Sequence, residues 1–311
     1  RSISCVLASV RRASPLIVLR ALAKRSVRDS SMALRYTEMM SNLLYGAAPW
    51  LASLAYLLLG ARSLRQAPDG TTDRSFFQSV LLLGLCLHGL TLLPTWFGHQ
   101  DMTFGFAVAL SWMAWLTLVM LWTESWSHRM ARVGLLIYPS AAALVLLPLA
   151  FPGGVRLADP GALFRSHILV AMLAYSAFAV ASGQALLMLA QSRALHKPSR
   201  SNQWLVNLPP LLAMDASLSR SVGLGFVLLT ATLITGGLVN QLAGGPWLKS
   251  DHKTVFTVMT WLSAGLFLWG RWRWGWRGRL AARFAIGGFG LLLLAYVGSR
   301  FVLEVFLGRV A

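Results

Sequence analysis

HILVAMLAYSAFAVASGQALLMLA, residues 167–190, decides the fold of this chain. The stretch carries no charged side chain and exceeds the ~20 apolar residues that a helix needs to span the hydrocarbon of a bilayer. In lipid its backbone groups must bond within the segment, so the segment must be helical. Its many alanines and serines suit close packing against other membrane helices. The stretch therefore predicts a transmembrane helix inside a bundle.

Seven further stretches have the same apolar character. They cover residues 42–61, 76–97, 102–122, 131–150, 220–243, 253–270 and 284–308. The whole chain is 56% hydrophobic and 12% charged, whereas a soluble domain carries about 25% charged residues. These observations predict an all-α fold, a polytopic membrane helix bundle of about eight transmembrane helices over residues 42–308.

The net charge of +18 would suggest nucleic acid binding in a soluble protein. Here the basic residues lie in short loops between apolar runs, where topology and anionic lipid explain them better, so no nucleic acid partner is predicted. One set of alternating loops holds Arg62, Arg65, Arg74, Arg129, Arg132, Arg193, Lys197, Arg200, Arg220, Arg271, Arg273, Arg277, Arg279 and Arg283, and the other holds only Arg156, Arg165, Lys249 and Lys253. Because basic loops stay in the cytoplasm, we expect a multi-pass membrane protein with both ends of the core outside.

Residues 1–41 form a basic extension that disagrees with this topology. A tail so rich in arginine should stay in the cytoplasm, although the core begins outside. We expect this extension to be disordered or a mis-assigned start, with Met32, Met39 or Met40 as the first residue of the protein. The alternative is a targeting segment, because the extension is rich in arginine and serine and poor in acidic residues.

Three histidines lie where a membrane helix has few structural reasons to keep one. His88 lies in the middle of the run 76–97, whereas His167 and His252 each stand at the start of another run, on the predicted outer side. A neutral imidazole is a good iron ligand, so we predict His167 and His252 as axial ligands of a haem iron and His88 as an internal site. The alternatives are a half-solvated cap for the first two and, for His88, a neutral ring bonded to a neighbouring helix.

Two further residues are candidates to contact the same haem. Trp247 lies towards the outer side, where its indole suits an aromatic shelf for a porphyrin. Arg300 lies inside the last apolar run, where its guanidinium suits a haem propionate or pairs with Glu304 four residues on.

The chain has two cysteines and no CxxC, CxxCH, P-loop, HExxH or GxSxG pattern, so any haem is non-covalent and neither ATP use nor hydrolysis is predicted.

Three stretches of the chain carry a resemblance to a known family. They are MLAYSAFAVASGQALLML after His167, DHKTVFTVMTWLSAGLFLWG from Asp251, and GWRGRLAARFAIGGFGLLLLAYVGSRFVLEVF over residues 275–306. They resemble the cytochrome c assembly protein family, in particular its inner-membrane YpjD and HemX-like branch, related to CcsA and CcmC. The resemblance covers residues 42–308 and implies a protein that binds or passes haem for cytochrome c maturation, with other maturation proteins as partners. It also implies histidine ligands at the outer ends of helices that flank a tryptophan-rich loop, a role that His167 and His252 fit.

The tryptophan-rich loop departs from the family pattern. The family motif ends in a WxWDPKE-like run, and here GGPWLKSDHKTV retains Trp247, Asp251 and Lys253, with His252 in place of the proline. This degraded motif favours haem binding or an accessory role over haem attachment, so no enzyme is predicted. The residues leave two other functions open, a haem-free membrane scaffold subunit and, ranked last, a small-solute transporter.

Overall fold

The computed structural model describes the membrane core of the chain. The described residues are 46–63, 74–97, 101–127, 134–152, 155–158, 160–196, 205, 208–249, 251–298 and 301. Residues 48–311 form one compact unit. The predicted basic extension with its candidate start residues, as well as Arg300 and Glu304, lies outside the described residues.

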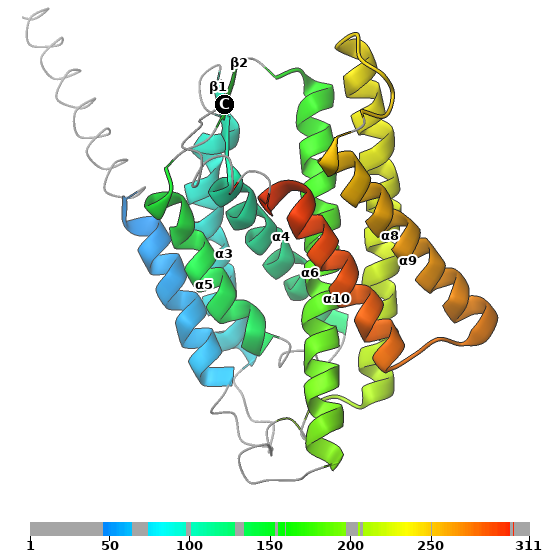
Figure 1. Cartoon of the computed structure of the whole chain (residues 1–311). Helices are drawn as coiled ribbons and strands as arrows, with labels where there is room; N and C mark the ends of the chain where they lie inside the picture. Colours follow the sequence, from blue (N-terminus) through cyan, green and yellow to red (C-terminus); the bar gives the residue numbers. More distant parts are fainter. Residues whose placement is uncertain are drawn as a thin grey trace, which may run out of the picture. The chain divides into compact units, whose positions relative to one another are not determined.

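Eight helices whose bounds are described make up this unit (Figure 1). They are a helix over residues 46–63, α3 (Arg74–Phe97), α4 (Phe106–Ser127), α5 (Gly134–Ala150), α6 (Ala162–His196), α8 (Leu211–Leu242), α9 (His252–Trp274) and α10 (Arg279–Leu293). The π-helix η3 (Leu294–Gly298) extends α10, and five helical segments, those of α3, α4, α6, α8 and α10 with η3, are long and apolar enough to cross a membrane. The predicted all-α multi-pass membrane bundle is confirmed.

One short pairing of strands was not expected from the sequence. β1 (Asp101–Phe104) lies between α3 and α4, and it pairs antiparallel with β2 (Val155–Ala158), between α5 and α6. Phe104 lies opposite Val155. The prediction of a transmembrane helix from residue 102 was therefore wrong at its start, because the backbone groups of residues 101–104 bond to a second strand and α4 begins only after Gly105.

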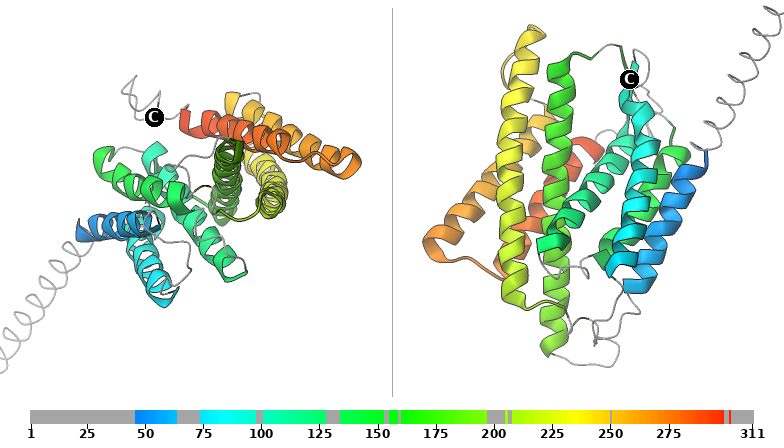
Figure 2. Two further views of the ribbon diagram at one scale, coloured as in Figure 1. Left: turned by 90° about the horizontal axis from the view of Figure 1, so that it is seen from below. Right: turned by 180° about the vertical axis from the view of Figure 1, so that it is seen from behind.

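The core of the bundle divides into two packed clusters that share α4. One cluster joins α4 to α6, α8, α9 and α10, and the other joins it to the helix over residues 46–63, α3 and α5. The right-hand view of Figure 2 shows α8 and α9 on one side of α6, α10 crossing it, and the remaining helices on the other side. Alanines on α6 are fully buried, and Gly225 on α8 lets the Phe178 ring come so close that a Cβ there would lie 2.8 Å from it. Small residues thus bring α6 and α8 into close contact, as expected in lipid.

α6 and α8 are among the helices that begin earlier than their apolar runs suggested. α6 begins at Ala162, where Gly161 accepts backbone bonds from Phe164 and Arg165, so His167 lies in the second helical turn and does not open the helix. α8 begins at Leu211, directly after Pro210. In both cases a proline or glycine breaks the chain and the polar residues that follow are taken into the helix. The extra turns bring His167 and Asp215 into the packed bundle.

Candidate functional site

A cavity of about 420 Å³ lies where α6 begins, α8 ends and α9 begins. Its walls come from these three helices, from β1 and from η3. They are mostly apolar and aromatic, with Phe104, Phe164, Met172, Tyr175, Trp247 and Tyr296 among the lining residues. A cavity of this size and character is typical of a site for an organic ligand, with a few polar groups to orient it.

His167 is the imidazole in the wall of this cavity. It lies on α6, is partly buried, and its Nδ1 is 2.9 Å from the hydroxyl oxygen of Thr235 on α8. α8 therefore holds the imidazole through the contact of Nδ1 with Thr235 and through a bond between the ring and the backbone of Thr232.

The contacts of Thr235 favour one tautomer of His167. Its hydroxyl lies 2.8 Å from the carbonyl oxygen of Ala231 and 3.2 Å from that of Thr232, so its single hydrogen is donated to its own helix. In this arrangement the same oxygen accepts from His167, which favours a neutral ring with its proton on Nδ1. Nε2 is left with a lone pair, the form of imidazole that binds a metal.

Two adjacent glycines on α8 make room for the aromatic groups of the cavity. A Cβ at Gly236 would lie 3.0 Å from Cε1 of His167, and a Cβ at Gly237 would lie 2.4 Å from the indole of Trp247. Any larger residue at either position would displace a ring. The glycine pair therefore fixes how His167 and Trp247, both predicted from the sequence, come together at one cavity.

The π-helix η3 builds another part of the cavity wall. Ala295 and Tyr296 of η3 line the cavity, and Nζ of Lys253 on α9 lies 5.6 Å from the centre of the Tyr296 ring. Single π-turns within α-helices are frequent at functional sites, because the extra residue redirects the side chains that follow. Lys253 brings a positive charge to a cavity that is otherwise mostly apolar.

Asp251 and His252 stand at the start of α9. Asp251 lines the cavity and caps the helix, accepting a bond of 2.9 Å from the backbone N–H of Thr254. Partial burial acts to raise the pKa of this carboxyl, but the bonds from Thr254 and the charges of Lys253 and His252 outweigh it and hold the pKa below its usual value. His252 is exposed and does not line the cavity, so its predicted role as a second axial ligand stays a prediction.

His88 lies apart from this cavity, in the cluster formed by α3, α4 and the helix over residues 46–63. It has no exposed surface, its Nε2 is 2.9 Å from the hydroxyl of Ser111, and its Nδ1 is 3.3 Å from the hydroxyl of Tyr56. Both ring nitrogens thus have a partner on a neighbouring helix. This geometry favours the alternative that the sequence left open, a neutral histidine bonded to neighbouring helices.

Several contributors to the site were missed in the sequence. Thr235 gave no signal of its own, since a threonine within a membrane helix usually bonds its own backbone. The Gly236–Gly237 pair was visible in the sequence, but its meaning depends on the rings that face it. Arg300, predicted to contact a haem propionate, lies outside the described residues, so its role stays a prediction.

The described residues form a multi-pass membrane bundle with a cavity at one end, lined by His167. Residues 75–307 match the family model described as Cytochrome C assembly protein, and the chain belongs to the cytochrome c assembly protein family. It is similar to the cytochrome c biogenesis protein CcsA of Prochlorococcus marinus strain MIT 9515, at 31% identity over 44% of this chain and 49% of that protein.

Two other relatives extend this similarity. The inner membrane protein YpjD of Escherichia coli K12 is 32% identical over 48% of this chain and 54% of its own length. A 28.8 kDa protein of Azospirillum brasilense is 28% identical over 87% of this chain and over its whole length. The matches to CcsA and YpjD therefore span about half of those proteins.

Proposed function

We propose that this protein binds haem non-covalently in the cavity beside His167 and handles it during cytochrome c assembly. The observation that carries the proposal is the Thr235–His167 pair, which holds Nδ1 and leaves the lone pair of Nε2 available. Membership of the cytochrome c assembly protein family and the similarity to the cytochrome c biogenesis protein CcsA support the same conclusion. We further propose that residues 42–308 act as one transmembrane domain for this purpose.

The lining residues fit a haem on three counts. His167 supplies a nitrogen ligand of the kind that iron accepts, and the aromatic and aliphatic walls suit the apolar face of a porphyrin. Lys253 and Asn240 also line the cavity and suit the carboxylates at the edge of the ring. When bound, haem would supply a redox-active iron and the group that a cytochrome needs. The residues of this chain bind it, orient it and keep it from bulk water.

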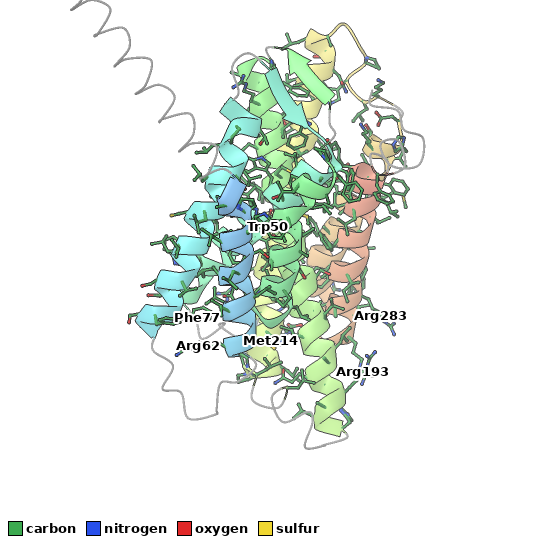
Figure 3. The ribbon with its side chains drawn as sticks, turned by 90° about the vertical axis from the view of Figure 1, so that its left-hand side faces the viewer. Trp50, Arg62, Phe77, Arg193, Met214 and Arg283 are labelled. Atoms are coloured by element: carbon green, nitrogen blue, oxygen red, sulfur yellow. The ribbon has the colours of Figure 1, made fainter. Side chains whose placement is uncertain are left out.

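The charges of the bundle support an outward-facing cavity. Exposed arginines gather at the end opposite the cavity, where α6 and α9 end and α8 and α10 begin, and Figure 3 shows Arg193 and Arg283 towards that end. Basic residues favour the cytoplasmic side of a membrane protein, which would place the cavity on the outer side of an inner membrane. Cytochrome maturation partners on that side would then reach the haem directly.

The degraded tryptophan-rich loop supports a role in binding and transfer without covalent attachment. Trp247 lines the cavity and packs on Gly237, which suits an aromatic shelf. His252 replaces the proline of the family motif and is exposed at the rim. Other maturation proteins would take the haem onward.

A haemin titration tests the proposal. The purified chain in detergent should develop a Soret band with added haemin, and His167→Ala should weaken binding by about 100-fold or more, because an axial ligand is worth more than the groups that orient it. His196→Ala is a matched control, since its ring lies at the far end of α6 from the cavity and its Nδ1 is 2.6 Å from the carbonyl oxygen of Ser192. No Soret band beyond that of free haemin in detergent would sink the proposal and favour the haem-free scaffold.

The spin state of the bound iron tests His252. Ligation by His167 alone should give a high-spin ferric spectrum, whereas ligation by both histidines should give a low-spin spectrum that His252→Ala converts to high-spin. A low-spin spectrum unchanged in His252→Ala would assign the second ligand to another residue of the cavity.

A further inference from the structure

The chain between α9 and α10 forms a second site, at the opposite end of the bundle from the cavity. We propose that this α9–α10 hairpin, defined as residues 269–283, binds the headgroups of anionic phospholipids. The proposal is independent of haem binding, and it depends on a rigid turn, a group of exposed arginines and a shelf of tryptophans.

A buried carboxylate holds the turn in place. Asp215 on α8 has only 6% of its side chain exposed, and it accepts from Nη1 of Arg271 at 2.8 Å and from the backbone N–H of Gly278 at 2.8 Å. Arg271 also donates to the carbonyl of Trp276 at 3.3 Å. The carboxylate thus ties both ends of the turn to α8, so the turn is preordered for a ligand.

The same turn needs two glycines and stacks its aromatic rings. Gly275 and Gly278 have φ of 68° and 65°, in the left-handed region that other residues rarely adopt. Trp276 lies between Trp274 and Phe284, with ring planes 23° and 21° from parallel and centres 5.5 Å and 5.6 Å away. The turn is therefore a fixed aromatic platform and not a loose connection.

Four exposed arginines surround this platform. They are Arg273, Arg277, Arg279 and Arg283. Among the side chains that the structure describes, the carboxylates are those of Asp215 and Asp251; Asp215 is bonded to Arg271, and Asp251 lies at the cavity end. The hairpin therefore presents four exposed positive charges, and neither of the two carboxylates whose side chains are described lies beside them unbonded. Guanidinium groups match phosphate oxygens in a bidentate geometry.

The surroundings of the hairpin identify the phosphate as that of a lipid. Exposed apolar residues follow one face of α9 at helical spacing: Val255, Met259, Leu262, Leu266 and Trp269. This stripe faces outward from the bundle and ends at the hairpin, where Trp272 is 82% exposed and Trp274 is 54% exposed. Large exposed tryptophans beside arginines are typical of the headgroup layer. A ligand at the end of a lipid-facing stripe is a phospholipid, with its chains along the stripe and its phosphate at the arginines.

The test compares two pairs of arginine substitutions at the same end of the bundle. The full chain in detergent micelles is titrated with phosphatidylglycerol or phosphatidylcholine, and bound lipid is measured by native mass spectrometry together with the melting temperature. The variant Arg273→Gln/Arg277→Gln alters the hairpin. The control Arg193→Gln/Arg220→Gln removes the same charge from exposed positions on α6 and α8.

Phosphatidylglycerol should raise the melting temperature of the native chain more than phosphatidylcholine does. Each hairpin arginine should account for about a fivefold change in affinity, so the hairpin variant should bind phosphatidylglycerol roughly 25-fold more weakly. The control pair should lose markedly less, and inorganic phosphate should not reproduce the effect. Equal losses of phosphatidylglycerol affinity in both variants would show that diffuse surface charge explains the binding, and they would overturn the proposal. Equal binding of the two lipids would also overturn it, as would full competition by inorganic phosphate.

Discussion

The two buried or half-buried histidines of this bundle share the same chemistry but differ in how they are held. His88 has a hydroxyl at each ring nitrogen, from Ser111 on one side and Tyr56 on the other, and no exposed surface. His167 has one hydroxyl, from Thr235, and its ring lines a cavity.

The difference shows what separates a structural imidazole from a ligand. Gly84 lets the Tyr56 ring close over the His88 site, since a Cβ there would lie 2.8 Å from that ring. Gly236 instead leaves space beside the imidazole of His167, which opens to the cavity. Burial of a histidine in a membrane helix is therefore a weak sign of function, and the number of its nitrogens already bonded is a stronger one.

The largest effect on stability should come from replacing His88, whose two ring nitrogens are both bonded. His88→Ala leaves a cavity and two buried hydroxyls without their partner, so the free energy of unfolding should fall by about 3 kcal/mol. Unfolding in a denaturing detergent measures the change, and Ser111→Ala should cost about 1 kcal/mol or less. The haemin affinity of folded His88→Ala should equal that of the native chain. A loss of the Soret band in this variant would indicate that His88, and not His167, binds the haem.

The next largest effect should be the loss of haemin affinity in Thr235→Val. The substitution keeps the shape of the side chain but removes the acceptor that holds Nδ1 of His167, and haemin affinity should fall by about 10- to 100-fold. Nitrogen NMR of the histidine ring should show the Nδ1–H form in the native chain and a mixture of forms in the variant. Thr257→Val is the matched control, since this cavity threonine bonds only the carbonyl of Lys253 on its own helix. Equal losses in both variants would assign the effect to cavity shape.

Gly236→Ala tests the space around the ring. The new methyl group would meet Cε1 of His167 at 3.0 Å and push the imidazole away, so haemin affinity should fall by about tenfold while the chain stays folded. Gly223→Ala, on the same helix with nothing within 4 Å of the added Cβ, should leave haemin affinity unchanged and stabilise α8 slightly. An unaltered affinity in Gly236→Ala would show that the position of the ring is not critical.

The smallest effect concerns the helix cap beside the cavity. Asp251→Ala should lower the free energy of unfolding by about 1 kcal/mol, because Thr254 loses its capping acceptor. Since the pKa of Asp251 is depressed in the folded chain, its contribution is present above the ordinary aspartate pKa of about 4 and is lost as pH falls through the lower folded value. Asp251→Asn should keep most of the cap without this acid dependence. Identical pH profiles of the native chain and Asp251→Asn would contradict the assignment.

The sequence predicted the bundle and two of the residues that meet at the cavity. Apolar length and loop charge were sufficient to place His167 and Trp247 towards the same side, because lipid permits few folds. The predicted helix starts were wrong, because hydropathy marks only the apolar part of a helix. Polar residues that follow a break such as Pro160–Gly161 belong to the helix as well. The bond between Thr235 and His167, and the two bonds of His88, depend on which helices are neighbours. A single sequence does not show which helices those are.

The strand pairing of β1 and β2 has a consequence for how this protein can change over time. The two strands are held by main-chain groups, and they connect the segment before α4 to the segment before α6. Backbone bonds do not depend on which side chains the residues carry. The amino acids of β1 and β2 can therefore change during evolution while the two strands stay paired. Distant relatives with little sequence identity in these strands should still have the pairing.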